Sequence, residues 1–281
     1  MNDRSVLITG CSSGIGERVA LGLKERGWRV FATARQAVDV ARLQAGGLES
    51  LPLDLRDSAS IRSAVDSVLE RTGGCLDALF NNAGYGQPGA VEDISRVALR
   101  EQFETNVFGV QELTNRVIPV MRQQGAGRIL YNSSVLGLVA FPYRGAYVAS
   151  KFALEGLADT LRLELAGTGI HVCLIEPGPI LSRFRDNAHA AYGRHVDAAT
   201  SLHRAQYEAM EARLLKRGPA APFTQPPEAV LQRVIHALES PRPQARYPVT
   251  FPTYLFAALR RLLPTRALDA ILRRAGGEGR R

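Results

Sequence analysis

A glycine-rich turn after the first apolar run constrains the fold more than any other feature of this sequence. The run 5–9 is typical of a buried strand, and it leads into Gly10-Cys11-Ser12-Ser13-Gly14-Ile15-Gly16. The three glycines allow a tight turn from a strand into a helix, and they let backbone N–H groups approach a pyrophosphate. The spacing is G-x-x-x-G-x-G, which differs from the general G-x-G-x-x-G dinucleotide fingerprint. The turn therefore predicts a nucleotide site, with a purely structural strand–helix turn as the alternative.

The rest of the chain repeats the alternation of short apolar runs with helical patterns. The predicted strands are 5–9, 28–33, 48–53, 76–81, 128–132, 170–175 and 246–249, and the predicted helices are 14–26, 58–70, 97–122, 147–165 and 228–238. Pro119 is expected to kink or end the helix 97–122. Apolar strands that alternate with helices indicate βαβ units and a parallel sheet covered on both faces. The sequence thus predicts an α/β fold, a single Rossmann-type doubly wound parallel sheet with helices on both faces.

The length of 281 residues suits one large domain, and no linker separates two cores. We expect residues 1–250 to form the catalytic domain. Within it, the more polar segment 183–225 is expected to be a helical insertion that covers the substrate. The remainder, 251–281, combines Phe, Leu and Tyr with arginines and is expected to be a basic amphipathic tail.

The net charge of +8 and pI near 9.8 raise the question of a polyanionic partner. Seven arginines in 255–281 face only Asp269 and Glu278, so five of the eight net charges lie in this segment. We see no basic stripe with interleaved aromatics, so no nucleic-acid partner is expected. The tail is expected either to cap the substrate pocket, to contact an anionic membrane, or to pack on the sheet edge as a solvated helix.

Cysteine and histidine usage limits the remaining classes. Three cysteines without close spacing form neither a disulfide framework nor a zinc site, and the five histidines show no ligand spacing. No metal is expected. The N-terminus has no signal-peptide pattern and no run is long enough to span a membrane, so the expected location is cytoplasmic, with membrane association left open.

Several motifs, in order along the chain, resemble those of the short-chain dehydrogenase/reductase family. They are T-G-x-x-x-G-x-G at 9–16, Asn81-Asn82-Ala83-Gly84, Asn106, Ser134, Tyr147-x-x-x-Lys151 and Pro177-Gly178. The segments 148–158 and 176–184 resemble the branch that contains 17β-hydroxysteroid and retinol dehydrogenases, and NADP-dependent aldehyde reductases are also similar. The resemblance implies an enzyme that acts on CH–OH donors with a nicotinamide cofactor.

The resemblance and the local charge together predict the cofactor contacts. These residues are Gly10, Ser12, Ser13, Gly14, Ile15, Gly16, Arg35, Asp54, Leu55, Asn82, Ala83, Gly84, Tyr147, Lys151, Pro177, Gly178, Ile180 and Ser182. NAD enzymes need an acid at the end of the second strand, whereas NADP enzymes place an arginine there. Here Thr33 and Ala34 precede Arg35, so NADP(H) is preferred over NAD(H). A surface role for Arg35 and a capping role for Asp54 are the alternatives.

The expected chemistry is hydride transfer between an alcohol and a carbonyl compound. Tyr147 and Lys151 are four residues apart on one predicted helix face, and the lysine charge is expected to lower the pKa of Tyr147, the acid/base. Ser134 is expected to hydrogen-bond the substrate oxygen, with Ser133 as its neighbouring rival. The resemblance implies that Asn106 holds a water that links Lys151 to solvent.

The substrate is expected to be a hydrophobic alcohol, aldehyde or ketone, because Tyr85, Phe141, Pro142 and Tyr143 lie in the loops that should surround it. The resemblance further implies a homodimer or homotetramer that forms through 98–122 and 146–165. The alternative to an enzyme is a nucleotide-binding redox sensor with little turnover, which would be marked by loss of Tyr147 or Lys151. Both residues are present.

Overall fold

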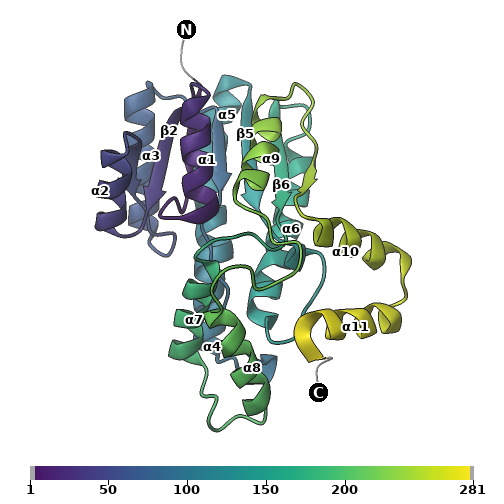
Figure 1. Cartoon of the computed structure of the whole chain (residues 1–281). Coiled ribbons are helices and arrows are strands. Elements are labelled where there is room, and N and C mark those ends of the chain that lie inside the picture. Colours follow the sequence, from purple (N-terminus) through teal and green to yellow (C-terminus); the bar gives the residue numbers. More distant parts are fainter. Residues whose placement is uncertain (1–3, 279–281) are drawn as a thin grey trace.

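The fold is built on a seven-stranded, wholly parallel sheet (Figure 1). The computed structural model describes residues 4–278. The strands are β1 (Ser5–Ile8), β2 (Arg29–Ala34), β3 (Glu49–Pro52), β4 (Ala78–Asn81), β5 (Gly127–Asn132), β6 (Ile170–Glu176) and β7 (Arg246–Pro248). Their order is β3-β2-β1-β4-β5-β6-β7, so the direction of winding reverses between β1 and β4. The predicted doubly wound Rossmann-type fold is confirmed.

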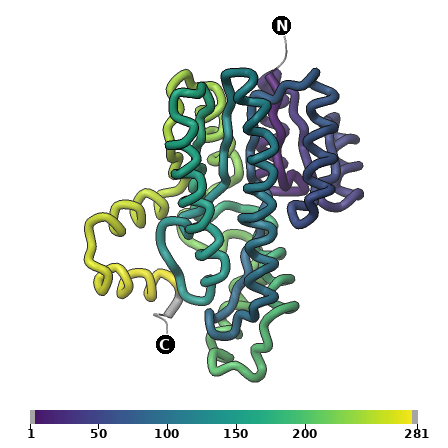
Figure 2. Tube along the Cα trace, turned by 180° about the vertical axis from the view of Figure 1, so that it is seen from behind, coloured from purple at the N-terminus to yellow at the C-terminus, as the bar shows by residue number. Residues whose placement is uncertain are grey.

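Helices cover both faces of this sheet (Figures 1 and 2). They are α1 (Gly14–Glu25), α2 (Ala37–Ala45), α3 (Ser58–Thr72), α4 (Arg96–Phe103), α5 (Gly109–Gln124), α6 (Gly145–Glu164), α7 (Phe184–His195), α8 (Arg204–Leu215), α9 (Glu228–Glu239), α10 (Phe251–Leu262) and α11 (Thr265–Arg273). Among the described residues, no helix combines the length and the apolar character needed to cross a membrane.

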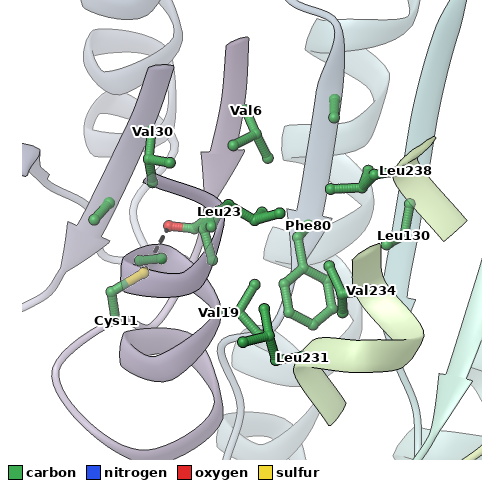
Figure 3. Close-up of a cluster of buried hydrophobic side chains, with 14 of the residues drawn as sticks. Val6, Cys11, Val19, Leu23, Val30, Phe80, Leu130, Leu231, Val234 and Leu238 are labelled. Carbon is green, nitrogen blue, oxygen red and sulfur yellow. Dashed lines mark hydrogen bonds between the residues drawn. The ribbon is translucent and has the colours of Figure 1, made fainter. Parts of the chain in front are cut away.

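Two hydrophobic cores lie on opposite faces of the sheet because alternate strand residues point to opposite sides. In β1, Val6 and Ile8 pack with α1 and α9, whereas Leu7 packs with the residues of α3, α5 and α6. Figure 3 shows the first core, where Val19 and Leu23 of α1 lie beside Phe80 of β4. Because both faces are buried, the middle strands are mostly apolar, as in the Val-Leu-Ile of β1 and the Ala-Leu-Phe of β4.

The helical segments differ from the sequence predictions at three places. The helix 97–122 is interrupted by a π-helical turn, η2 (Glu104–Phe108), between α4 and α5. Pro119 does not end α5, which continues to Gln124. The short helix α2 was not predicted; only Val40 and Leu43 of its nine residues are buried, so its apolar pattern is weak.

The loops at the carboxyl ends of the strands carry four of the motifs identified in the sequence, whereas Asn106 lies in a helical turn and the Tyr147–Lys151 pair lies in α6. The glycine turn follows β1, Asn82 follows β4, Ser134 follows β5, and Pro177 follows β6. Helices α7 and α8 extend beyond this edge, beside the C-terminal helices α10 and α11 (Figure 1). In open parallel sheets, ligands bind at this edge near the reversal of strand order.

Candidate active site

The turn between β1 and α1 has a backbone that only glycine adopts easily. Gly10 and Gly14 have φ angles of +71° and +60°, in the left-handed region. A β-carbon at Gly10 would lie 2.8 Å from Ala83 Cα, and one at Gly14 would lie 2.8 Å from Ser182 Cβ. Ser13 makes no side-chain hydrogen bond that caps α1. The turn therefore presents backbone N–H groups at a positive helix end, which suits an anion.

Side chains from β4 and β5 hold this turn in place. The Thr9 hydroxyl accepts hydrogen bonds from the backbone N–H groups of Asn82 and Ala83, each at 2.9 Å. The Asn82 amide donates to the carbonyls of Thr9 (2.8 Å) and Gly10 (3.1 Å), and its oxygen accepts from Asn132 Nδ2 (3.0 Å). The Asn-Asn-Ala-Gly segment thus fixes the shape of the glycine turn.

A cleft runs along the carboxyl edge of the sheet, and most of the predicted cofactor residues line it. Those that line it are Gly10, Ser12, Ser13, Ile15, Gly16, Arg35, Asp54, Leu55, Asn82, Ala83, Gly84 and Ser182. The remaining predicted residues do not line it: Gly14, Tyr147, Lys151, Pro177, Gly178 and Ile180. Tyr147 and Lys151 are buried beneath other side chains, and Ile180 faces the first core.

At one end of the cleft, the charges are arranged around the end of β2. The exposed Arg35 and the half-buried Asp54 both line the cleft. The Arg56 guanidinium binds the Asp54 carboxylate at 3.1 and 2.7 Å and holds the pKa of that carboxyl below its ordinary value. Thr33 directs its hydroxyl to the Ile8 carbonyl (3.1 Å). Asp57, rather than Asp54, caps the helix α3. The Asp54 carboxylate accepts the Arg56 backbone N–H at 3.0 Å, so it caps the turn after β3, as one of the sequence alternatives expected.

Tyr147, Ser134 and Lys151 meet where β5 and the first turns of α6 come together. All three side chains are buried. Lys151 donates to the Asn132 carbonyl at 2.6 Å, and its Nζ lies 5.7 Å from the centre of the Tyr147 ring. The rival Ser133 instead hydrogen-bonds Glu155. The geometry therefore places Ser134, rather than Ser133, beside the tyrosine.

The sequence predicts that the charge of Lys151 lowers the pKa of Tyr147. In the structure, the pKa of Tyr147 is raised instead. Burial raises the pKa of Tyr147 to about 12, and the Ser134 hydroxyl opposes this shift. Burial also lowers the pKa of Lys151 to about 8, against the attraction of Glu155. Both shifts have one cause, because removal from water disfavours the charged form of each group. Desolvation is thus the largest cause of the pKa shift at both groups.

Asn106 lies in the π-helical turn η2 and is buried. Its side chain accepts from the Tyr85 backbone N–H (3.1 Å) and donates to the Tyr85 carbonyl (2.9 Å) and to Ser150 Oγ (3.1 Å). Ser150 precedes Lys151, so Asn106 joins the loop after β4 to the catalytic helix. Single π turns in α-helices are frequent at functional sites.

The lid helix α7 contributes residues that the sequence did not single out. Phe184, Asn187 and Arg194 line the cleft, and the Phe184 ring lies 5.3 Å from the Tyr147 ring in an edge-to-face contact. The sequence located an insertion at 183–225, but it carries no motif that identifies these side chains. Their role follows from the tertiary contact alone.

Comparisons with known proteins agree with this geometry. The family model described as short chain dehydrogenase matches residues 4–193. The "Uncharacterized oxidoreductase YbbO" of Escherichia coli strain K12 is 45% identical over 96% of this chain and 94% of that protein. Human 17-beta-hydroxysteroid dehydrogenase type 1 is 36% identical over 92% and 80%.

A solved structure agrees as well. A short chain dehydrogenase/reductase from Burkholderia phymatum in complex with NAD superposes with a TM-score of 0.78 at 25% identity, over 98% of this chain and 96% of that one. The family model covers more than half of the present chain, and the relatives cover nearly all of it. The protein belongs to the short-chain dehydrogenase family of oxidoreductases.

Proposed function

We propose that this protein is an NADP(H)-dependent oxidoreductase that interconverts a hydrophobic alcohol and its aldehyde or ketone. The observation that carries the proposal is the convergence of Tyr147, Ser134 and Lys151 directly behind the cleft. Lys151 contacts Asn132 and Tyr147 contacts Phe184, and both of these partners line the cleft. A structural tyrosine–lysine pair would not need the glycine turn, the Asn82 network and the serine at the same edge. The proposal is therefore that of a complete catalytic group beside a nucleotide site.

The residues present fit a dinucleotide. A β-carbon at Gly10 or Gly14 would collide with Ala83 or Ser182, so the turn keeps its shape only with glycine at these positions. Ile15 and Gly16, at the N-terminus of α1, line the cleft. Ser12 and Ser13 would add hydroxyl groups next to a pyrophosphate, and Asp54 and Leu55 would lie near the adenine. When bound, the nicotinamide supplies or accepts the hydride.

The proton-transfer steps fall to the side chains of this chain. Tyr147 holds its proton at Oη, since burial raises its pKa to about 12. In reduction it would donate this proton to the substrate oxygen, and in oxidation it would accept one. Ser134 Oγ would hydrogen-bond the same oxygen as negative charge develops on it. Lys151, fixed by the Asn132 carbonyl, would favour the tyrosinate through its charge.

The substrate surface beside Tyr147 is apolar. Val135, Leu136 and Val139 of the loop after β5 pack in one cluster with Tyr147, and Phe141 lies at the border of this cluster. Phe184 approaches from the lid. Such a surface favours a hydrophobic carbonyl compound over a sugar or a small polar one.

The preference for NADP(H) rests on charge at the end of β2. Arg35 lines the cleft without an acid at positions 33 or 34, and a guanidinium can bind a phosphate through two hydrogen bonds. Asp39, which also lines the cleft, lies 3.6 Å from Arg42, which lessens its repulsion of a phosphate. One solved relative binds NAD, so the proposal for this chain depends on Arg35 itself.

We expect Arg35→Ala to weaken use of NADPH by roughly 10- to 100-fold in kcat/KM, because a charge-assisted hydrogen bond to phosphate contributes about 1.5–3 kcal/mol. Use of NADH should change little, since it lacks the 2′-phosphate. Steady-state rates with both cofactors measure the effect. Arg62→Ala, on the exposed side of α3, is the matched control. Equal losses with NADPH and NADH, or faster turnover of wild type with NADH, would contradict the assignment.

The activity itself is tested by following NADPH absorbance with medium- and long-chain aldehydes, retinaldehyde and steroid ketones. Turnover should rise with the apolar character of the carbonyl compound, and small polar aldehydes should react slowly. If NADPH binds but no compound of the panel is turned over, the regulatory nucleotide-binding alternative gains support instead.

A further inference from the structure

The two C-terminal helices form an arm that is attached to the body of the molecule by one face only. This C-terminal arm consists of α10 and α11, residues 251–273. On the inner face, Phe256 and Leu272 pack into the cluster around Tyr147, and the Phe256 ring lies 5.5 Å from the Phe141 ring. In Figures 1 and 2 the arm projects sideways from the body, on the side opposite α2 and α3.

Arg260 fastens the arm to the catalytic region. Its guanidinium donates a hydrogen bond to the Leu138 carbonyl, in the loop that follows Ser134. The same group lies 5.0 Å from the Phe152 ring of the catalytic helix α6. The inner face of the arm therefore packs against the loop that follows Ser134 and against α6.

The outer face of α10 is an apolar stripe exposed to solvent. Its members are Phe251, Tyr254, Leu255, Ala258 and Leu262, at the spacing that places side chains along one side of a helix. Leu262 is 78% exposed and Phe251 is 54% exposed. Exposed Phe223, in the loop before α9, contacts Phe251 with ring centres 5.0 Å apart and extends the stripe. A continuous exposed apolar surface of this kind marks an interaction site.

The same arm carries exposed positive charge. Arg261, Arg266, Arg273 and Arg274 are exposed and form no ion pair with any side chain that the structure describes. Between residues 251 and 274 the sequence has one acid, Asp269. The last two arginines of the predicted basic tail, Arg280 and Arg281, lie outside the described residues.

We propose that the C-terminal arm binds the surface of an anionic lipid bilayer, with the apolar stripe of α10 in the headgroup region and the arginines on lipid phosphates. Charge complementarity decides between this occupant and a second copy of the chain. A symmetric dimer through the stripe would bring the arginines of both copies into one interface, where they repel. Anionic lipid offers apolar and negative groups together, as amphipathic basic helices require.

Binding through the arm would orient the enzyme on the bilayer. Because the inner face of the arm packs on the loop between Ser134 and Tyr147, a bilayer on the outer face would lie close to the substrate side. The binding itself does not depend on the proposed oxidoreductase activity, and the test below measures binding only. Failure of one proposal therefore leaves the other standing.

Flotation of the full-length protein with lipid vesicles tests the proposal. Vesicles of phosphatidylcholine with phosphatidylglycerol should carry the protein upward, and pure phosphatidylcholine should carry much less. The double variant Arg261→Gln/Arg266→Gln should bind anionic vesicles about 25-fold more weakly, from roughly five-fold per arginine near an anionic surface. Added salt should weaken wild-type binding.

The stripe is tested by Leu255→Gln/Leu262→Gln, which should reduce vesicle binding by roughly ten-fold or more. The matched control Leu202→Gln/Leu215→Gln removes two exposed leucines from the lid region, 95% and 60% exposed, and should bind as wild type does. Equal flotation of both double variants would overturn the proposal. So would a wild type that does not float but sediments as a dimer that Leu255→Gln/Leu262→Gln converts to a monomer, since the stripe would then bind a second copy.

Discussion

Tyr147→Phe is expected to lower kcat for carbonyl reduction by about 10³-fold, within the roughly 10²- to 10⁴-fold contribution of a positioned acid or base. The variant removes only the hydroxyl oxygen, so the ring keeps its contact with Phe184 and its place in the apolar cluster. Binding of NADPH, followed by fluorescence titration, should be nearly unchanged. The loss therefore appears in the chemical step, and kcat and kcat/KM should fall by similar factors.

Two controls separate this loss from a structural effect. Tyr247→Phe removes a hydroxyl on β7 that accepts the Gln244 backbone N–H away from the cleft lining, and it should leave kcat unchanged. Thermal unfolding of Tyr147→Phe should match wild type within a few degrees, since the variant loses one hydroxyl but keeps the packed ring. Wild-type kcat in a folded Tyr147→Phe variant would show that another group supplies the proton.

The strands and the glycine turn could be predicted because their signals are local. A strand buried on both faces is mostly apolar, and the runs around Val6, Phe80 and Ile129 show this as short blocks of consecutive apolar residues. The left-handed φ angles at Gly10 and Gly14 likewise require glycine, which a sequence shows directly. The π turn at Glu104–Phe108 has no such signal, because one extra residue in a helical turn does not change the apolar period visibly.

The pKa values in the site were harder to predict from the sequence than the residues that form it. Tyr147 and Lys151 lie where the spacing placed them, yet the pKa of Tyr147 is raised because burial dominates. Burial is a property of the assembled fold, here of Phe184 on α7 and of the loop after β5. The position of the tail was also left open by composition. Phe256 and Leu272 pack on the catalytic loop through contacts across more than 100 residues of chain, which no local pattern encodes.

On the far side of Lys151 lies a cluster of three acidic side chains that share one arginine, Arg246. Arg246 of β7 donates to Glu155 and, at 2.6 Å, to Glu176 of β6, and its second nitrogen contacts Asp159 at 2.5 Å. Glu155 lies one turn beyond Lys151 on α6 and also binds Ser133. Burial raises the pKa of Glu155 above its ordinary value, and burial together with Glu155 raises the pKa of Glu176 to about 7. The positive charge of Arg246 thus offsets the cost of burying the carboxylates of Glu155 and Glu176.

Arg246→Leu is therefore expected to lower the free energy of unfolding by about 3 kcal/mol, the lower end for breaking a buried ion pair because this side chain is partly exposed. The loss should depend on pH. Glu176, with a folded pKa near 7 against an ordinary 4.5, binds more protons in the folded state, so stability falls as pH rises through this interval. Without Arg246 both glutamates should titrate still higher, so the variant should lose more stability at about pH 8 than at about pH 5.5.

Urea unfolding at both pH values measures this loss. The control is Arg162→Leu, which removes the other arginine that contacts Asp159 and should cost less than about 1 kcal/mol. A loss for Arg246→Leu that is equal at the two pH values would show that Glu155 and Glu176 are not held ionised by this arginine.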